Sequence, residues 1–437
     1  MAEAITTQGF TREAFEAFLE SRAEPGWLRD LRAAAWADFE RLPAPSQRDE
    51  EWMRTDIRLF RWNQFGFPGD GAAVSDGAAE ALLTAGVQLG GQVLAVDSRP
   101  QSARIDERLR AKGVLFGSLD ELVAEHGDLV RKHLFRAFDT QYDKFAALHA
   151  AAWSGGTLLY VPRGVVVNEP LHMLSALTPG ASDFGHALVI LEDGAEATLL
   201  AETASSHETA TGLHCGAVEL LVGRGSRLRY VNFQNWSNGV WHFAHQKALV
   251  DADGALQWTI AALGARLAKV NQHVALVGAG AAAQVNGVMF TEGKQHLSYH
   301  TLQHHRAPHT RSDLLYKTAL QDVSRTVWRG MIKVDPAAQK TDGYQRNDNL
   351  MLSDHARSDS IPGLEILADD VRCTHGSTTG RVDDEQIFYA RCRGLTRKEA
   401  VRMVVAGFFQ QVFDRITIDS VREALGQAIG RRIREYD

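Results

Sequence analysis

The central part of the chain repeats a short glycine turn at nearly constant intervals. Four apolar segments each end in such a turn: Leu188-Val-Ile-Leu-Glu-Asp-Gly194, Leu221-Val-Gly-Arg-Gly225, Leu249-Val-Asp-Ala-Asp-Gly254 and Leu276-Val-Gly-Ala-Gly280. The last glycines of these segments are 31, 29 and 26 residues apart, and no helical pattern lies between them. A repeat of this length made of strands alone predicts a solenoid, in which each coil buries its apolar face against its neighbours. We therefore expect a mainly β chain that folds as a parallel β-helix.

Both flanks of the repeat have helical patterns. Apolar residues recur at helical spacing from Thr11 to Leu42, and Pro25-Gly26 divides this segment into two helices. A Gly/Ala-rich stretch at residues 66–95 is typical of a loose connection, and Ser118-Leu-Asp-Glu121 is typical of a helix N-terminus. We expect an N-terminal helical region at residues 1–153, a β-helix core at 154–390 and a C-terminal helical region at 391–437.

The C-terminal helix has a clear start and one apolar face. Thr396-Arg-Lys-Glu399 fits a capping box, in which the first and fourth residues satisfy each other's backbone amides. An apolar stripe follows at a spacing of three or four residues and includes Val401, Val405, Phe408, Phe409 and Val412. This stripe either caps the open end of the β-helix or contacts another protein, and the pattern leaves both alternatives open.

Cys373 and His375 form the most informative pair of reactive side chains. They lie one residue apart in a segment that reads as extended, so both are expected on one face of a strand. A thiol and an imidazole make half of a site for a soft metal. The other cysteines, Cys215 and Cys392, form no Cys-x-x-Cys pair, so a metal here would need ligands from elsewhere, for example from another chain. The alternative is a buried thiol beside a hydrogen-bonded histidine.

The residues around this pair resemble a known family. Gly376-Ser-Thr-Thr-Gly-Arg-Val-Asp-Asp-Glu-Gln-Ile-Phe-Tyr389 follows the pair, and Arg306-Ala-Pro-His-Thr-Arg-Ser312, Asn349-Leu-Met-Leu-Ser353 and Pro362-Gly-Leu-Glu-Ile366 precede it. In content and order these segments are similar to the SufB/SufD family of iron-sulfur cluster assembly proteins, and the Cys-x-His pair resembles its SufD form. The likeness is strong from about Tyr142 to Phe413.

The resemblance implies a right-handed parallel β-helix and a scaffold without catalytic activity of its own. It implies pairing with SufB through the β-helix ends, and docking of the ATPase SufC on the C-terminal helices through Val401, Val405, Phe408, Phe409 and Val412. It further implies a transient iron-sulfur cluster at the SufB-SufD interface, to which His375 supplies imidazole nitrogen while SufB supplies thiolate. Cys373 is either a second ligand or a packed thiol, and the packed or supporting role is favoured.

Several alternatives within and beyond the family stay open. A SufB-like subunit is the nearer one, but the position of the SufB cysteine falls near Ala356, and no cysteine lies between Cys215 and Cys373. The chain alone could pair with itself, and flavin binding to the complex is unknown. A polysaccharide-active β-helix enzyme would need paired carboxylates along a groove, whereas Asp369-Asp370 and Asp383-Asp384-Glu385 read as turn residues.

Composition and missing motifs exclude other classes of function. The net charge is −7, and Arg431-Arg-Ile-Arg434 is the densest basic run, so no nucleic acid partner is expected. No Gly-x-x-x-x-Gly-Lys-Ser/Thr loop occurs, so ATP hydrolysis is expected only in the partner. We find no run of ~18 apolar residues and no apolar leader at the N-terminus, which predicts no membrane span and no export. Three cysteines in 437 residues favour the cytoplasm.

Two polar runs in the repeat region allow more than one interpretation. His296, His300 and His304 would share a face of a helix and could bind metal, but alternating residues around Tyr299 and the presence of Pro308 favour an extended segment. His305 and His309 are then expected to make interior or interface hydrogen bonds. Further on, one strand face carries polar residues that form either a stacked amide ladder or a solvent-facing surface: Thr341, Gly343, Gln345, Asn347 and Asn349.

Overall fold

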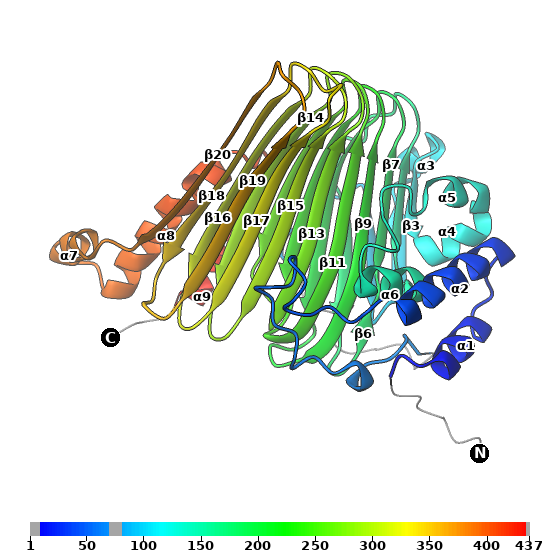
Figure 1. The fold of residues 1–437 in the computed structure, drawn as a ribbon, viewed down its shortest axis with the longest axis horizontal. Helices are drawn as coiled ribbons and strands as arrows, with labels where there is room; N and C mark the ends of the chain where they lie inside the picture. Colours follow the sequence, from blue (N-terminus) through cyan, green and yellow to red (C-terminus); the bar gives the residue numbers. More distant parts are fainter. Residues whose placement is uncertain (1–8, 70–80, 434–437) are drawn as a thin grey trace.

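The body of the protein is a parallel β-solenoid of about eight turns, with helices at both ends of the chain (Figure 1). It was obtained as a computed structural model, which describes residues 9–69 and 81–433. The expected mainly β fold and parallel β-helix are confirmed. From residue 186 onward, successive strands alternate between two long sheets, so neighbouring strands within a sheet are one coil apart in the sequence.

Sheet A is ten-stranded, in the order β2-β1-β5-β8-β10-β12-β14-β16-β18-β20. Its neighbours run parallel except for the antiparallel pair β1 and β2. The bounds of its strands are β1 Gly91–Val96, β2 Arg99–Ile105, β5 Leu171–Leu177, β8 Glu196–Ser205, β10 Arg227–Asn235, β12 Ala255–Ala262, β14 Ala282–Thr291, β16 Arg311–Leu320, β18 Asp342–Met351 and β20 Arg372–Arg381.

Sheet B has the order β19-β17-β15-β13-β11-β9-β7-β4-β3, and the short β6 also pairs with β9. Only β3 and β4 are antiparallel among the described strand pairs of this sheet. The bounds of its strands are β3 Leu115–Ser118, β4 Thr157–Val161, β6 Ser182–Asp183, β7 His186–Leu191, β9 Thr211–Val222, β11 Gly239–Val250, β13 Leu267–Leu276, β15 His296–His305, β17 Arg325–Val334 and β19 Arg357–Ile366.

The repeated turns that separate the coils require left-handed backbone. Gly194, Gly225 and Gly280 have φ of 70°, 64° and 75°, a region that glycine enters without steric cost. In the remaining turn the left-handed residue is Asp253, at φ 54°, rather than Gly254. Aspartate tolerates this conformation because its short polar side chain can bond locally. The glycine repeat thus marks the coil turns, with one position shifted by a residue.

Most helices of the N-terminal region cover the outer face of sheet B. Its helices are α1 Arg12–Glu20, α2 Gly26–Arg41, η1 Trp62–Gln64, α3 Glu107–Ala111, α4 Leu119–Glu125, α5 Gly127–His133 and α6 Lys144–Ala152. The helix starts expected at Thr11 and Ser118 are confirmed, because both side chains accept a bond from a backbone amide of the first turn. Buried aromatic residues of this region, such as Phe145, pack with residues of β11, such as Phe243.

The prediction of a loose connection at residues 66–95 is wrong at its C-terminal end. Gly91 to Val96 form β1, which pairs in parallel register with β5 and extends sheet A. Short length and a flanking glycine hide this strand in the sequence. Residues 70–80 of the same stretch lie outside the described residues. The domain boundaries at residues 153 and 390 stay a prediction, and β1, β2 and β3 precede the first of them.

The three C-terminal helices described lie beside the outer face of sheet A: the second and third pack on it, and the first packs against the second. They are α7 Asp384–Cys392, α8 Arg397–Phe413 and α9 Asp419–Arg432, and α8 begins at the predicted capping box of Thr396 and Glu399. The apolar side of α8 contacts outward residues of β14 and β16, such as Phe290 and Leu315. The helix therefore lies along the side of the solenoid, and the alternative that its stripe caps the open end is wrong.

The lumen of the solenoid is apolar over much of its length but contains buried amides near its C-terminal end. Gln345, Asn347 and Asn349 are at most 3% exposed, so the interpretation of a solvent-facing surface is wrong. They form no stacked ladder either, because their register partners on β16 are Leu314, Tyr316 and Thr318. Instead, Asn349 Nδ2 donates to Asn347 Oδ1 at 2.8 Å within the strand, and Gln345 Nε2 donates to the carbonyl of Gly363 across the lumen at 3.0 Å.

Candidate functional site

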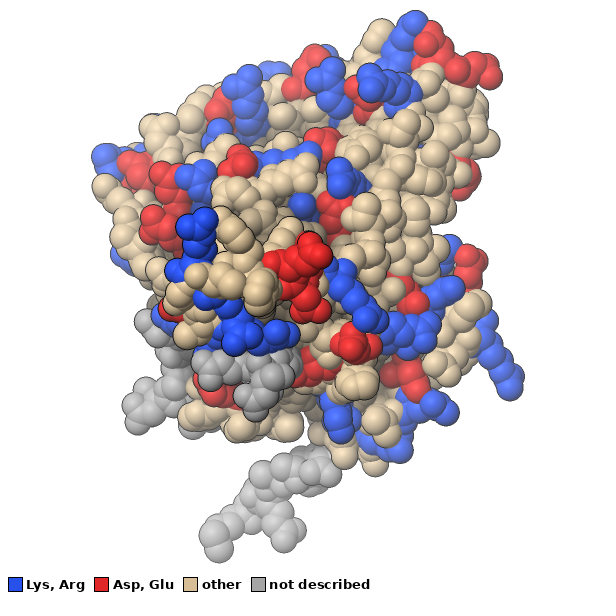
Figure 2. All heavy atoms as spheres, turned by 90° about the vertical axis from the view of Figure 1, so that its left-hand side faces the viewer, with Lys and Arg blue, Asp and Glu red and all other residues tan. Residues whose placement is uncertain are grey.

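The two last strands of the solenoid form an open end. In the part of the chain that the structure describes, β20 pairs only with β18, and β19 pairs only with β17, so each leaves one backbone edge unpaired. Ser377 of β20 donates to Ser360 of β19 at 2.8 Å and links the two strands across the lumen. Figure 2 faces this end of the molecule and shows acidic and basic side chains interspersed around uncharged areas.

Cys373 and His375 both lie on the inner face of β20, as their spacing predicts. Their register partners on β18 are Gly343 and Gln345, and Gln345 is buried in the lumen. Cys373 is half-buried and packs against Ile332, Val334, Ala338 and Ala368, whereas His375 is exposed. The difference arises because the loop before β20 shields Cys373, while nothing in the described chain covers the middle of the strand.

The environment of the pair separates the two groups chemically. Burial raises the pKa of the Cys373 thiol, which disfavours the thiolate that binds metals. His375 has an accessible imidazole, and the neutral ring is a common metal ligand. Among residues 9–69 and 81–433, no group of three or more His, Cys, Asp or Glu side chains is arranged to hold a metal ion. A metal at His375 therefore needs further ligands from another molecule.

The residues predicted to contact the ATPase are mostly turned inward. Val405, Phe409 and Val412 are fully buried against sheet A, and Val401 is 8% exposed. Phe408 is partly exposed, and its ring lies 4.6 Å from Nζ of Lys317 on β16.

Three large side chains on the outward side of the same lobe are exposed instead. Phe388 and Tyr389 of α7 are 68% and 60% exposed, and Met403 of α8 is 53% exposed. Analysis of the sequence missed them, because periodicity identifies an apolar stripe but not a single apolar residue on the opposite face. We call these three residues the α7–α8 patch.

The five candidate histidines are not brought together as a metal site. The strand β15 carries four of them, which confirms the extended reading. His300 lies 2.8 Å from Nζ of Lys269, and His304 lies 2.8 Å from Asp335. His305 bonds the hydroxyls of Thr310 and Ser312 in the interior, as expected.

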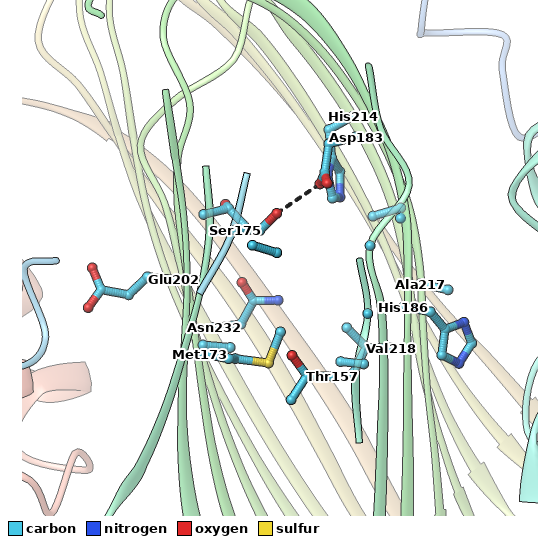
Figure 3. Close-up of a pocket in the computed structure, with 18 of the residues that line it drawn as sticks. Thr157, Met173, Ser175, Asp183, His186, Glu202, His214, Ala217, Val218 and Asn232 are labelled. Carbon is cyan, nitrogen blue, oxygen red and sulfur yellow. Dashed lines mark hydrogen bonds and ion pairs between the residues drawn. The ribbon is translucent and has the colours of Figure 1, made fainter. Parts of the chain in front are cut away.

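An enclosed cavity of about 50 Å³ lies in the lumen near its N-terminal end (Figure 3). The carboxylate of Asp183 accepts hydrogen bonds from His214 Nδ1 at 2.7 Å and from Ser175 at 3.1 Å beside it. His242 Nε2 is buried at the cavity and has no hydrogen-bond partner among the residues that the structure describes. A volume of this size accommodates a few water molecules and no iron-sulfur cluster. The cavity is therefore not a candidate cluster site.

Two lysines are buried on the outer face of sheet B, beneath the segment at residues 50–56. Lys269 Nζ donates to the carbonyl of Glu51 at 2.8 Å, and Lys247 lies against His273 with its Nζ 4.6 Å from the ring of Tyr142. Burial lowers the pKa of both lysines to about 7. In sequence they look like ordinary solvent-facing residues of alternating strands, so no local pattern indicates their burial.

Comparisons with known proteins cover nearly the whole chain. Residues 174–408 match the model "SUF system FeS cluster assembly, SufBD core domain", and residues 13–173 match "SufBD protein N-terminal region". The iron-sulfur cluster assembly protein SufB of Bacillus subtilis (strain 168) is 27% identical over 429 residues, which cover 92% of this chain and 89% of that protein. A SufBD family protein of Staphylococcus epidermidis (strain ATCC 12228) is 25% identical over 426 residues, with the same two coverages. Within the described residues, no helix is both long and apolar enough to cross a membrane. The chain belongs to the SufBD family of iron-sulfur cluster assembly proteins.

Proposed function

We propose that this protein is a SufD-type scaffold subunit of the cytoplasmic Suf machinery, which assembles iron-sulfur clusters. In this role it pairs with SufB, binds the ATPase SufC and contributes to a nascent cluster at the SufB-SufD interface. It carries out no bond-making catalysis of its own. The cluster is a product that passes through the site, and ATP is hydrolysed by the partner.

The position of His375 carries the proposal. Its imidazole is exposed on the inner face of the last strand, at the end of a solenoid whose two terminal strands each leave one edge unpaired by any described residue. Unpaired N–H and C=O groups favour the addition of another strand. A second solenoid that joins at this end would place its own side chains beside His375. SufB is the proposed second solenoid, and a second copy of this chain is the alternative when SufB is missing.

The chemistry of the site suits transient binding. An imidazole in place of a thiolate leaves a cluster less negatively charged, which weakens its attachment and favours its release to an acceptor. The main thiolate is proposed to come from SufB, because the pKa of Cys373 is raised by burial. Cys373 then packs behind the ligand strand and supports it.

The ATPase is proposed to bind the lobe formed by α7 and α8. Val401, Val405, Phe409 and Val412 hold α8 on sheet A from beneath, while Phe408 lies at the border of the packed face. The α7–α8 patch supplies the exposed apolar contact that a protein partner would cover.

Co-expression tests this function. The chain is produced with tagged SufB and with SufC, and the purified material is assayed for all three chains, iron and sulfide. We expect all three chains to be retained, and the chain alone to show no ATPase activity above background. Recovery of SufB and SufC without this chain, or its recovery with neither, would contradict the proposed partners.

A SufB-like role within the same family is the second candidate, and the similarity to the protein SufB of Bacillus subtilis favours it. The Cys-x-His pair at residues 373–375 favours the SufD form, and Ala356, near the expected position of the SufB cysteine, is a buried alanine. The two roles differ in one observation. A SufB-like subunit would support cluster assembly with SufC alone, and a SufD-type subunit would require SufB.

A further inference from the structure

A buried carboxylate joins the last strand of sheet A to the two strands behind it. Asp348 of β18 is 3% exposed. Its Oδ1 accepts hydrogen bonds from the hydroxyl of Thr378 on β20 at 2.7 Å and from Nε of Arg346 at 2.9 Å. Its Oδ2 lies 3.5 Å from Nζ of Lys317 on β16. The carboxylate therefore connects three successive coils on the outer face of the sheet.

The same lysine contacts the C-terminal lobe. Lys317 is 7% exposed, and its Nζ lies 4.6 Å from the centre of the Phe408 ring on α8, within the range of a cation–π contact. Phe408, Lys317, Asp348 and Thr378 thus form a continuous series of contacts from α8 to β20. Thr378 is three residues beyond His375 on the same ten-residue strand.

The charges in this series are held in a fixed geometry. Although burial opposes the charged form, hydrogen bonds from Thr378 and Arg346 and the charge of Lys317 keep the pKa of Asp348 below its ordinary value. Burial lowers the pKa of Lys317, and the charge of Asp348 opposes this effect. Removal of Lys317 would leave Arg346 as the cationic partner of Asp348, and would take away the cation that also contacts Phe408. At Lys317 and Asp348 the series is buried, unlike the exposed ion pair of Lys333 and Glu365 on the other sheet.

We propose that Lys317 and Asp348 are positioning residues that fix strand β20, and with it His375, relative to helix α8. This inference rests on the proposed function, because it assigns the contact between the ATPase-binding lobe and the cluster strand. A displacement of α8 would act on Phe408 and Lys317 first, and would then reach β20 through Asp348 and Thr378.

The reactivity of Cys373 reports the position of β20 directly. Its thiol is half-buried on the inner face, so movement of the strand away from Ile332 and Val334 would expose it further and speed its alkylation by N-ethylmaleimide. The assay uses the full chain with Cys392→Ser, because Cys392 is exposed and Cys215 is buried. Mass spectrometry of the alkylated peptide identifies the modified residue.

Changes at the far end of the series are expected to accelerate this alkylation. Phe408→Ala and Lys317→Met should each raise the rate about tenfold, the ratio that corresponds to ~1.4 kcal/mol. Lys317→Arg keeps the charge and should stay close to the unmodified rate. Lys333→Met removes the exposed ion pair and serves as the matched control. Rates within about twofold of the control for both Phe408→Ala and Lys317→Met would overturn the proposal.

A double-mutant cycle separates a connected series from general loosening. Phe408 contacts Lys317 on β16, whereas Thr378 lies two strands away on β20, so the effects of Phe408→Ala and Thr378→Val on the rate should multiply if the sites are independent. We expect the alkylation rate of the double variant to be lower than this product, because either change alone already breaks the series of contacts. A full product of the two effects would overturn the proposal.

A measurement of SufC binding to the same proteins distinguishes failure of the proposed function from failure of the positioning role. If SufC does not bind the unmodified chain, the proposed docking is wrong, and the alkylation rates still decide whether α8 positions β20. If SufC binds and the rates of the variants equal that of the control, docking stands and the positioning role is wrong.

Discussion

Gln345 and His375 are register partners on β18 and β20, yet Gln345 is fully buried and His375 is exposed. Both side chains point toward the lumen, and His375 lies one coil closer to the open end than Gln345. The amide is covered by the last coil, whereas the imidazole has no further coil above it in the described chain. The candidate site is therefore a property of the end of the solenoid, where an inward-facing residue becomes available to a partner.

The two residues of the Cys-x-His pair should differ in their importance for assembly. Cys373→Ser nearly preserves the side-chain volume, and the pKa of this thiol is already raised by burial. We expect the reconstituted complex to keep most of its iron and sulfide in this variant, and to lose much more in His375→Ala. Abolished assembly in Cys373→Ser with normal assembly in His375→Ala would reverse the proposed roles.

Binding of SufC should depend on the exposed side of the lobe. The double variant Phe388→Ala and Met403→Ala removes two apolar contacts of the α7–α8 patch and should weaken binding by about 2 kcal/mol or more, as loss of interface anchors does. Titration calorimetry with SufC measures the change. The thermal unfolding of the double variant should match that of the unmodified chain, since neither Phe388 nor Met403 is buried.

The buried side of the same helix should show the opposite behaviour. Phe409 is fully buried between α8 and sheet A, so Phe409→Ala should lower the free energy of unfolding by about 3–5 kcal/mol. Denaturant titration provides the measurement. A stability loss below ~1 kcal/mol in this variant would show that α8 does not pack on the solenoid as described.

Stability should rise with pH above neutrality because of Lys247 and Lys269. Burial lowers the pKa of each in the folded protein to about 7, from 10.5 in the unfolded chain. Between these values the unfolded state binds more protons, so the free energy of unfolding increases with pH, by at most about 1.4 kcal/mol per unit for each lysine. Below pH 7 both states are protonated and this contribution to the slope disappears.

Unfolding titrations between pH 7 and pH 9 measure this slope. We expect the variant with Lys247→Met and Lys269→Met to show a shallower slope than the unmodified chain. Lys112→Met, which changes an exposed lysine, serves as the control. Equal slopes in all three proteins would mean that the two buried amines stay protonated at neutral pH.

Much of the fold could be predicted because the solenoid repeats local information. Each coil needs a turn, and glycines such as Gly194 and Gly225 mark these turns. β1 was missed because its pairing with β5 is a long-range contact, and its six residues carry little pattern of their own. The side of the solenoid on which α8 packs was also beyond prediction, since an amphipathic stripe does not identify its partner.

The candidate site was only partly predictable for the same reason. The shared face of Cys373 and His375 follows from the period of a strand, and the structure agrees. Exposure of His375 depends on which coil is the last, and burial of Lys269 depends on a segment more than two hundred residues earlier in the chain. Such properties arise from tertiary contacts, which no local pattern contains.

The iron and sulfide content of the complex tests the central claim most directly. Complexes of SufB and SufC with the unmodified chain, with His375→Ala or with the control His207→Ala, an exposed histidine in another turn, are purified and reconstituted under identical conditions. We predict that His375→Ala keeps its partners and its thermal stability but loses most of its iron and sulfide, while His207→Ala matches the unmodified chain. Normal iron and sulfide in His375→Ala, with a stability loss of about 2 kcal/mol or more, would contradict the account and make this histidine structural.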